Sequence, residues 1–298
     1  MIAELPASDT AATRLSGGLI PFKSHYVEVA GAPVHYLDEG TGPVIVFVHG
    51  NPAWSLLYRH MIAGLKDRYR CIAPDHAGFG LSEVPAGFDF RPESHAARLA
   101  GFLDALGLAE VVLVGHDWGG PTMLGAAMAA PERVRGLVIG NTWAWDIRGD
   151  KHFERFSKLM GGGLVRALTP SLIPFVNVVL RTSFRRRKLS RAEMEAYRAP
   201  FKAGGQPRTG MHVFPREIVQ SGDWLSTLED FASGYDGPVL LIWPENDVAF
   251  KAPELTRWQA LMPQAETRKI PRCGHFLWDD APDDALAVLR PWLDALPG

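Results

Sequence analysis

The chain has 298 residues, of which 47% are hydrophobic and 21% are charged, as in an ordinary water-soluble globular protein. This length suits one large α/β domain, or one domain that carries an insertion. The formal net charge of −2 gives no basic surface for a polyanion, so we expect no nucleic-acid partner. No apolar run approaches the roughly 20 residues of a membrane span, so we expect no integral membrane segment.

The cysteine content and the N-terminal residues bear on the compartment. The two cysteines, Cys71 and Cys273, are too few for a disulfide framework and fit a reducing environment. The first residues include Glu4 and Asp9 and lack the apolar stretch of a secretory signal. We therefore expect a cytoplasmic protein. Residues 1–22 are aperiodic and rich in Ala, Ser, Thr and Gly, which predicts an arm on the surface.

Strand and helix patterns alternate along most of the chain. In order, we predict a hairpin over 25–37, a strand over 44–48, a helix over 56–65, a strand over 70–73, a helix over 91–106, a strand over 111–114, a helix over 121–130, strands over 134–139, 239–242 and 267–270, and a helix over 282–295. This alternation favours a doubly wound, mainly parallel sheet with right-handed crossovers. The predicted fold class is therefore α/β.

The interval before the strand at 239–242 is unusually long. It spans about 100 residues, whereas a crossover needs only a dozen or so. Helical patterns in it cover residues 152–160, 172–180 and 191–199. We predict a helical cap over 145–225, inserted into a core domain formed by 23–144 and 226–298. Because the insertion leaves the carboxyl end of a strand, it should cover the crevice where such sheets bind ligands.

The stretch 111–120 ends a β-branched strand in Gly-x-Asp-x-Gly and continues into an Ala- and Met-rich helix. This is the layout of a nucleophile elbow, in which the middle residue projects from the end of the sheet. That residue is usually Ser, and here it is Asp117. A carboxylate needs no deprotonation and suits attack on saturated, electrophilic carbon, which leaves an ester for water to hydrolyse. A lone Asp after a strand is alternatively a helix N-cap or turn residue, but the glycine frame favours a nucleophile.

Two further titratable residues, Asp247 and His275, follow the ends of later predicted strands. Because parallel strands end at the same edge of a sheet, Asp247 and His275 can both converge on Asp117. The chain order of nucleophile, acid and histidine is also the one that this architecture uses. We predict that His275 takes a proton from the attacking water and that Asp247 orients the imidazole. Glu245 and Asp146 are alternatives for the orienting acid, and His275 alone is alternatively a surface histidine.

A second loop, His-Gly-Asn-Pro at 49–52, follows the strand expected beside the elbow strand. The backbone N–H groups of Asn51 and Trp118 can both point at the Asp117 carboxyl group, so we predict an oxyanion hole worth roughly 3–4 kcal/mol per donor. The side chains of Asn51 and Trp118 offer an amide NH₂ and an indole N–H, neutral donors that suit a departing halide. Alternatively, Asn51 is a turn residue and Trp118 a packing aromatic.

Other polar residues are assigned structural roles. His49 and His116 lie beside tight turns, where we expect backbone hydrogen bonding, and the remaining histidines show no ligand spacing, so we predict no metal site. No step of the chemistry above needs a cofactor. The run Arg-Arg-Arg-Lys at 185–188 is interpreted as a solvated helix face, with a contact to a membrane surface or a partner as the alternative.

Four motifs of this chain resemble those of the haloalkane dehalogenases of the α/β-hydrolase fold. They are His-Gly-Asn-Pro-Ala-Trp-Ser at 49–55, Gly-His-Asp-Trp-Gly-Gly at 115–120, Pro-Arg-Glu at 215–217 and Gly-His-Phe at 274–276. The resemblance extends over nearly the whole chain from about residue 25. It implies that Asp117 displaces halide, that His275 then activates water on the alkyl-enzyme ester, and that Asn51 and Trp118 bind the halide.

The resemblance also indicates a branch of the family. One branch places the orienting acid after the preceding strand, where this chain has Asn141. The chain therefore resembles the branch whose acid follows the later strand, at Asp247. The implied reaction converts a haloalkane into alcohol, halide and a proton, so the implied ligands are a small halogenated substrate, water and halide.

Two other enzyme classes share an aspartate nucleophile. Epoxide hydrolases use two cap tyrosines, whereas only Tyr197 lies between residues 145 and 224, and they usually carry an aromatic where Asn51 stands. The β-lactone decarboxylases of olefin biosynthesis resemble the same Asn, Trp and late-Asp pattern, and the motifs do not separate them from dehalogenases. A binding protein on this fold would have lost a catalytic residue, and none is lost. Substrate length and oligomeric state stay open.

Overall fold

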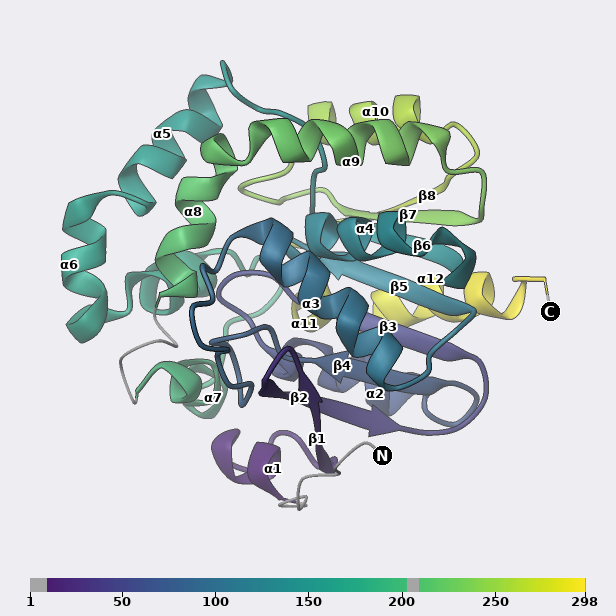
Figure 1. The fold of residues 1–298 in the computed structure, drawn as a ribbon, viewed down its shortest axis with the longest axis horizontal. Coiled ribbons are helices and arrows are strands. Elements are labelled where there is room, and N and C mark those ends of the chain that lie inside the picture. The colour runs from purple at the N-terminus through teal and green to yellow at the C-terminus, as the bar shows by residue number, and fades with distance from the viewer. Residues whose placement is uncertain (1–9, 203–208, 298) are drawn as a thin grey trace.

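The computed structural model describes residues 10–202 and 209–297. Its strands are β1 (Ser24–Val29), β2 (Ala32–Glu39), β3 (Val44–Val48), β4 (Arg70–Pro74), β5 (Val111–His116), β6 (Val134–Gly140), β7 (Val239–Pro244) and β8 (Glu266–Ile270). They form one sheet in the order β1-β2-β4-β3-β5-β6-β7-β8 (Figure 1). The pairs β1–β2 and β2–β4 are antiparallel, and the others are parallel. The predicted fold class is confirmed.

Side-chain composition explains where each strand lies in the sheet. The interior strands β5 and β7 are buried at every position, as expected for parallel strands covered on both faces. Strand β8 at the edge is mostly exposed and carries Glu, Thr, Arg and Lys, a composition that opposes edge-to-edge association. In the β1–β2 hairpin, Ala30 and Gly31 have φ of 51° and 77°, the left-handed values that a tight two-residue turn requires.

Helices cover both faces of the sheet. They are α2 (Arg59–Leu65), which continues a 3₁₀ turn η1 (Ser55–Tyr58), α3 (Pro92–Ala105), α4 (Gly119–Ala129), α9 (Gly222–Gly234), α10 (Ala252–Leu261), α11 (Leu277–Asp280) and α12 (Pro282–Asp294). Helices α3, α4 and α9 pack side by side on one face, and α2 packs with α12 on the other (Figure 1). A short 3₁₀ turn, η2 (Pro131–Arg133), leads into β6.

The long interval between β6 and β7 contains the helical cap. Its elements are α5 (Lys151–Met160), α6 (Gly163–Leu172), the π-helical η3 (Phe175–Leu180), α7 (Arg191–Lys202) and α8 (Gly210–Gln220). In Figure 1 they lie beyond the end of the sheet at which β5 turns into α4. The sequence patterns miss α6 and α8, because α6 begins at the last of three glycines at 161–163 and Pro215 lies inside α8. The boundaries at 145 and 225 stay a prediction, and α9 crosses the second of them.

The N-terminal residues differ from the expected surface arm in their described part. Residues 11–15 form the helix α1 (Ala11–Leu15), which contacts α7. Ala12 and Ile20 are fully buried, and the Ala12 N–H donates to Ser24 Oγ at 2.8 Å. The β1–β2 hairpin thus provides a surface on which the N-terminal residues pack. The sequence of those residues gives no sign of this contact. Residues 1–9 of the predicted arm lie outside the described residues.

Candidate active site

The turn after β5 holds the Asp117 side chain at the carboxyl edge of the sheet. Asp117 has a φ of 51°, a left-handed value that costs energy in a residue other than glycine. Its backbone N–H donates to Asn141 O at 3.0 Å, and its carbonyl accepts from Thr142 Oγ1 at 2.6 Å. The start of the β6–α5 loop thereby holds the strained elbow in place. This is the geometry that the Gly-x-Asp-x-Gly motif predicts.

Glycines allow two backbone segments to approach the elbow closely. A Cβ at Gly119 would collide with the carbonyl oxygen of Val48, so the start of α4 lies directly against the end of β3. A Cβ at Gly50 would collide with the Asp117 side chain. The loop after β3 therefore reaches the carboxylate with its backbone.

Two backbone donors contact the Asp117 carboxylate. The Asn51 N–H donates to Asp117 Oδ1 at 2.7 Å, and the Trp118 N–H also donates to the carboxylate. Burial raises the pKa of Asp117, whereas the neighbouring His275 and the two N–H donors lower it, and the net pKa is above the ordinary value. The arrangement is that of an oxyanion hole formed around the acid itself.

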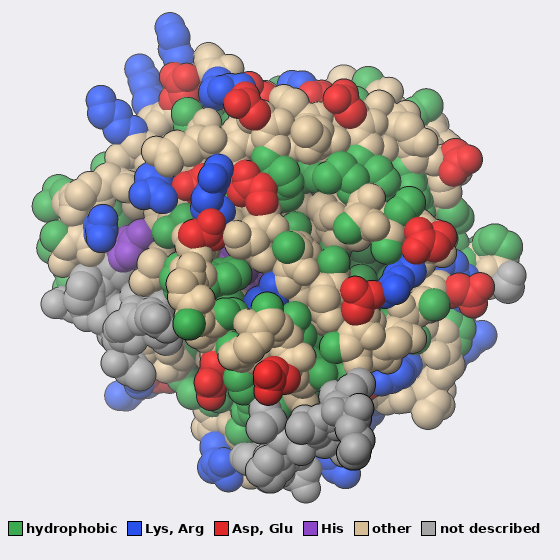
Figure 2. All heavy atoms as spheres, in the orientation of Figure 1, with side chains coloured by type: hydrophobic (Ala, Val, Ile, Leu, Met, Phe, Trp, Pro, Cys, Tyr) green, Lys and Arg blue, Asp and Glu red, His purple; other side chains and the backbone are tan. Residues whose placement is uncertain are grey.

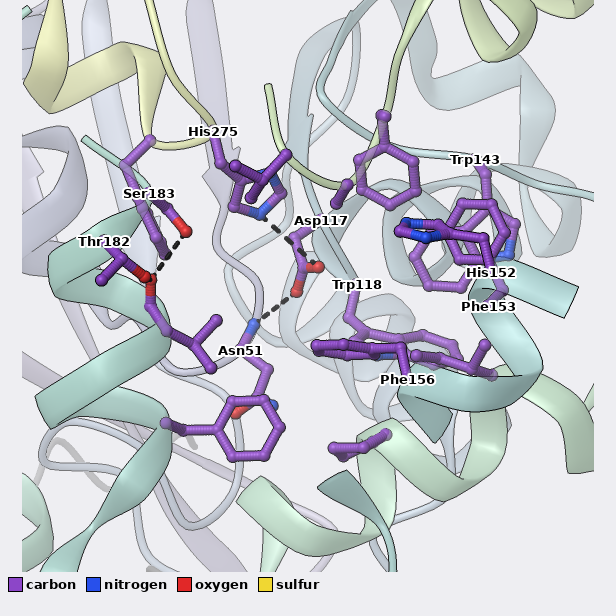
Figure 3. Close-up of a pocket in the computed structure, with 18 of the residues that line it drawn as sticks. Asn51, Asp117, Trp118, Trp143, His152, Phe153, Phe156, Thr182, Ser183 and His275 are labelled. Atoms are coloured by element: carbon purple, nitrogen blue, oxygen red, sulfur yellow. Dashed lines mark hydrogen bonds and ion pairs between the residues drawn. The ribbon is translucent and has the colours of Figure 1, made fainter. Parts of the chain in front are cut away.

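His275 lies between the Asp117 and Asp247 carboxylates (Figure 3 shows His275 facing Asp117). Its Nε2 is 3.8 Å from Asp117 Oδ2, and its Nδ1 is 2.9 Å from Asp247 Oδ2. Burial by itself lowers the pKa of His275, but the Asp247 charge and hydrogen bond, together with the Asp117 charge, outweigh it and raise the pKa above the ordinary value. The imidazole is thus a stronger base than a free histidine.

The acid beside His275 is Asp247 and neither of the alternatives. Asp247 is 6% exposed and accepts hydrogen bonds from the Ala249 N–H at 2.7 Å and from Asn141 Nδ2 at 2.5 Å. Burial raises the pKa of Asp247, but His275 and these donors lower it, so the pKa is below the ordinary value. Glu245 is exposed, and Asp146 pairs with the Arg148 side chain.

The structure also shows how Asn141, noted in the sequence only as a position without an acid, takes part in the site. Its side-chain amide donates a hydrogen bond to Asp247, and its carbonyl accepts one from the Asp117 N–H. Asn141, at the end of β6, therefore connects Asp247 with Asp117. A polar residue at a strand end was the only sequence signal.

The loop that carries His275 is bonded to the cap and to the core. The His275 N–H donates to Ser183 O, and the His275 carbonyl accepts from His116 Nε2, each at 3.0 Å. The Gly274 N–H donates to Asp280 Oδ2 at 2.7 Å. The imidazole position therefore depends on two segments that are distant in sequence, at Ser183 and His116, and on the nearby Asp280. The expected backbone role of His116 agrees with this contact, and His49 contacts the Gly50 carbonyl through Nδ1.

The basic run at 185–188 does not form a helix, so the solvated-helix interpretation is wrong. The backbone N–H groups of Arg185 and Arg186 donate to the buried Asp280 carboxylate. The Arg187 side chain pairs with the buried Asp279 and with Glu193. An acid that binds successive backbone N–H groups favours a bend over a helix. Asp279 and Asp280 lie more than 90 residues away in sequence.

The four predicted site residues other than Asp247 line one cavity of about 390 Å³. Figure 3 shows Asn51, Asp117, Trp118 and His275 around its centre. The rest of the wall is mainly apolar and includes the aromatic residues Trp143, Phe153, Phe156, Phe175, Phe250 and Phe276. A few converging polar groups within an apolar wall are typical of a site for a small, apolar molecule.

The Trp118 indole is held between two other aromatic rings. Phe214 of α8 stacks on it at a centroid distance of 5.1 Å and an interplanar angle of 23°, and Trp143 meets it edge-on at 4.6 Å. No acceptor among the described residues binds the Trp118 Nε1–H, and the side chain lines the cavity. Trp143 and Phe214 were not distinguished from core aromatics by sequence, because only the fold shows which rings contact Trp118.

Neither a metal centre nor a membrane span is found in the described part of the chain. Within residues 10–202 and 209–297, no three His, Cys, Asp or Glu side chains are grouped so that they could bind a metal ion. None of the helices described there is both long and apolar enough to cross a bilayer.

The chain is similar in sequence and structure to proteins of known activity. Residues 43–282 match the α/β-hydrolase fold family. The chain is 38% identical over 274 residues to haloalkane dehalogenase 2 of Mycobacterium tuberculosis, covering 91% of this chain and 95% of that protein. It is 33% identical over 285 residues to cis-3-alkyl-4-alkyloxetan-2-one decarboxylase of Shewanella oneidensis, covering 91% and 88%. The crystal structure of haloalkane dehalogenase DbeA from Bradyrhizobium elkani superposes with a TM-score of 0.84 at 27% identity, covering 92% of this chain and 98% of that one.

Proposed function

The chain belongs to the haloalkane dehalogenase family of the α/β-hydrolase fold, and on that premise we propose that it hydrolyses haloalkanes through a covalent ester on Asp117. One observation carries the mechanism. Asp117 Oδ1 accepts the Asn51 N–H at 2.7 Å, while Oδ2 faces His275 Nε2 at 3.8 Å. The carboxylate thus has one oxygen held by a backbone donor and one directed at the base, inside an aromatic cavity.

In the first step, Asp117 Oδ2 attacks the carbon that bears the halogen. A C–O bond forms as the carbon–halogen bond breaks, and the bonding electrons leave with the halide. The indole N–H of Trp118 and the amide of Asn51 border the same cavity and hold the departing anion by charge-assisted hydrogen bonds. The pKa of Asp117 is raised by burial, which makes the carboxylate more nucleophilic than one in water.

In the second step, His275 Nε2 takes a proton from water as the oxygen of that water adds to the ester carbon of Asp117. The Asn51 and Trp118 backbone N–H groups stabilise the negative charge on Oδ1. The tetrahedral intermediate collapses to release the alcohol and regenerate the carboxylate, with one proton left for solvent. Asp247 holds the Nδ1–H of His275 and stabilises the imidazolium that forms.

The activity is tested by a side-by-side assay of three substrates. We expect bromide from 1,2-dibromoethane, and no diol from styrene oxide. The second candidate function is that of a β-lactone decarboxylase, which would release an olefin from a long-chain β-lactone. That candidate is kept because a relative named as a decarboxylase is 33% identical to this chain and the aspartate chemistry is shared. Olefin without bromide would overturn the dehalogenase proposal.

Replacing Trp118 by Phe should weaken halide binding. The substitution keeps the stacked ring against Phe214 but removes the indole N–H, and a hydrogen bond to a charged group contributes about 1.5–3 kcal/mol. We expect the bromide dissociation constant, measured as product inhibition, to rise by roughly tenfold or more. Trp224→Phe is the matched control, because Trp224 does not line the cavity. If wild type and Trp118→Phe have the same bromide dissociation constant, then Trp118 does not bind the halide.

The rate of ester hydrolysis should depend on the protonation of His275. The base must be neutral, and its pKa is raised above the ordinary value by Asp247 and Asp117 against burial. Turnover should therefore be lost as the pH falls through the pKa of His275 in the alkyl-enzyme, which is lower than in the free enzyme because esterified Asp117 carries no charge. Asp247→Asn removes the charge that raises this pKa. The fall of kcat at the acid side of its pH profile should therefore occur at lower pH, and the maximal kcat should also be lower. An unmoved acid limb in the kcat profile would contradict the assignment of Asp247.

We also propose a cytoplasmic location. Cys71 and Cys273 are both free and buried, which supports folding in a reducing compartment. The proposed ligands are a small halogenated substrate, water and halide.

A further inference from the structure

A strongly basic segment extends from α5 to the bend after η3. Residues 151–188 contain nine Lys or Arg and a single acidic residue, Glu154. The local excess is eight positive charges, in a chain whose formal net charge is −2. Positive charge is therefore concentrated in one part of the cap, and the rest of the protein is acidic.

Most basic side chains of this segment have no acidic partner among the described residues. Arg186 and Arg187 pair with Asp284, Asp279 and Glu193. The others are exposed, and none forms an ion pair with an acid in the described part of the chain: Lys151, Arg155, Lys158, Arg166, Arg181, Arg185 and Lys188. Unpaired exposed charges of one sign produce a surface potential that attracts an anionic partner.

The same segment exposes large aliphatic side chains. Of the large hydrophobic residues that are exposed in the described chain, five belong to it: Leu159 (65%), Leu164 (73%), Leu168 (39%), Leu172 (55%) and Val178 (57%). Single exposed leucines need no explanation, but five exposed aliphatic side chains within residues 159–178, interspersed with unpaired basic ones, indicate an interaction surface. We name these five side chains, with the seven unpaired basic residues, the cap face.

The cap face lies at one end of the molecule and borders the cavity. Figure 1 places α5 and α6 together at the left, and Figure 2 shows basic side chains projecting over α5 and hydrophobic ones along the left edge over α6. Val178 belongs to the cap face and to the cavity wall. His152 and Arg185 also line the cavity and are exposed. The cavity therefore opens at the margin of the cap face.

We propose that the cap face docks on an anionic phospholipid surface, with the leucines in the boundary between headgroups and acyl chains and the basic side chains at the phosphates. Aliphatic side chains combined with Lys and Arg are what such a boundary binds. No described helix can span a bilayer, so the association is peripheral. The cavity mouth then faces the acyl region, from which an apolar molecule reaches Asp117 without crossing bulk water.

Two other occupants fit the charges and side chains less well. A second copy of this chain, docked face to face, would bring two sets of seven unpaired basic side chains together, which costs energy at such an interface. A nucleic acid would satisfy the basic side chains but would leave Leu164 and Leu172 without an apolar contact. A lipid surface accounts for both features.

Co-flotation of the full chain with unilamellar vesicles tests the proposal. We expect binding to vesicles of phosphatidylglycerol and phosphatidylcholine, weaker binding to phosphatidylcholine alone, and partial release by high salt because charge attraction is screened. Leu164→Asp should lower the vesicle partition coefficient by roughly tenfold or more. Arg155→Glu removes a basic charge worth about fivefold and adds a repelling charge of similar effect, so it should lower the coefficient by about 25-fold.

Matched controls lie outside the cap face. Met128→Asp changes an exposed hydrophobic residue of α4, and Lys269→Glu changes an exposed basic residue of β8. Both should leave the partition coefficient unchanged. Equal losses in the controls, or no binding to anionic vesicles, would overturn the proposal. A concentration-dependent dimer that Leu164→Asp abolishes would assign the face to a second copy and likewise overturn it. Bromide release measured without lipid reports the catalytic proposal separately.

Discussion

Asp117→Ala should abolish turnover, with kcat lowered by roughly 10⁴-fold or more. Among the described residues that line the cavity, Asp117 is the only carboxylate, and the neighbouring Asp247 is occupied by His275 and Asn141. The apolar cavity and the halide donors remain, but they cannot form a bond to substrate carbon. Bromide release from 1,2-dibromoethane measures the loss.

Asp117→Asn is the companion variant that separates chemistry from folding. Ala at a φ of 51° adds backbone strain of about 1–2 kcal/mol, whereas Asn tolerates the left-handed region and keeps an oxygen for the Asn51 N–H. We expect Asp117→Asn to unfold at or above the wild-type temperature, because it removes a charge from a buried site, and still to be inactive. Bromide release above about one hundredth of the wild-type rate by both variants would refute a nucleophilic Asp117.

His275→Phe should stop the reaction after the first step and leave a covalent alkyl-enzyme. The displacement of halide uses only Asp117, whereas hydrolysis of the ester needs a base for water. Mixed with a reactive bromoalkane, the variant should release one bromide per active site in a burst. Intact-protein mass spectrometry should then show a mass increase equal to the alkyl group.

Two controls define the site of the adduct. The double variant with Asp117→Asn should show neither the burst nor the mass increase. His25→Phe, on β1 and away from the cavity, should turn over normally. If His275→Phe shows steady turnover, or no adduct despite a bromide burst, then the ester mechanism is not the one this enzyme uses.

The two half-reactions place different demands on the same charges. Burial favours the neutral form of Asp117, while the charge of His275 and two backbone N–H groups favour the anion. His275 is raised in pKa by the carboxylates on either side of it. Once Asp117 is esterified it no longer carries its charge, so the pKa of His275 should be lower in the intermediate than in the free enzyme. The lower pKa favours the neutral imidazole at the stage at which His275 acts as a base.

The local sequence was sufficient for the main features of the sheet and for the nucleophile. Strand patterns such as the one at 44–48 coincide with β3 (Val44–Val48), because a strand covered on both faces must be apolar at every position. The elbow was recognisable because the cramped turn at Asp117 demands small neighbours, which a motif of a few residues records. Asp247 and His275 each follow the end of a predicted strand. Because parallel strands end at one edge of a sheet, the sequence also predicted that both side chains can reach Asp117.

Tertiary structure decided what depends on side-chain direction and on contacts between distant segments. Sequence alone left Glu245 and Asp146 as possible partners of His275, and only the fold buries Asp247 against the imidazole and adds Asn141. The run at 185–188 had the composition of a solvated helix, yet Asp280 binds its backbone N–H groups and bends it. Local patterns record which surface a residue prefers, but the partner that it meets there is set by the packing of the whole chain.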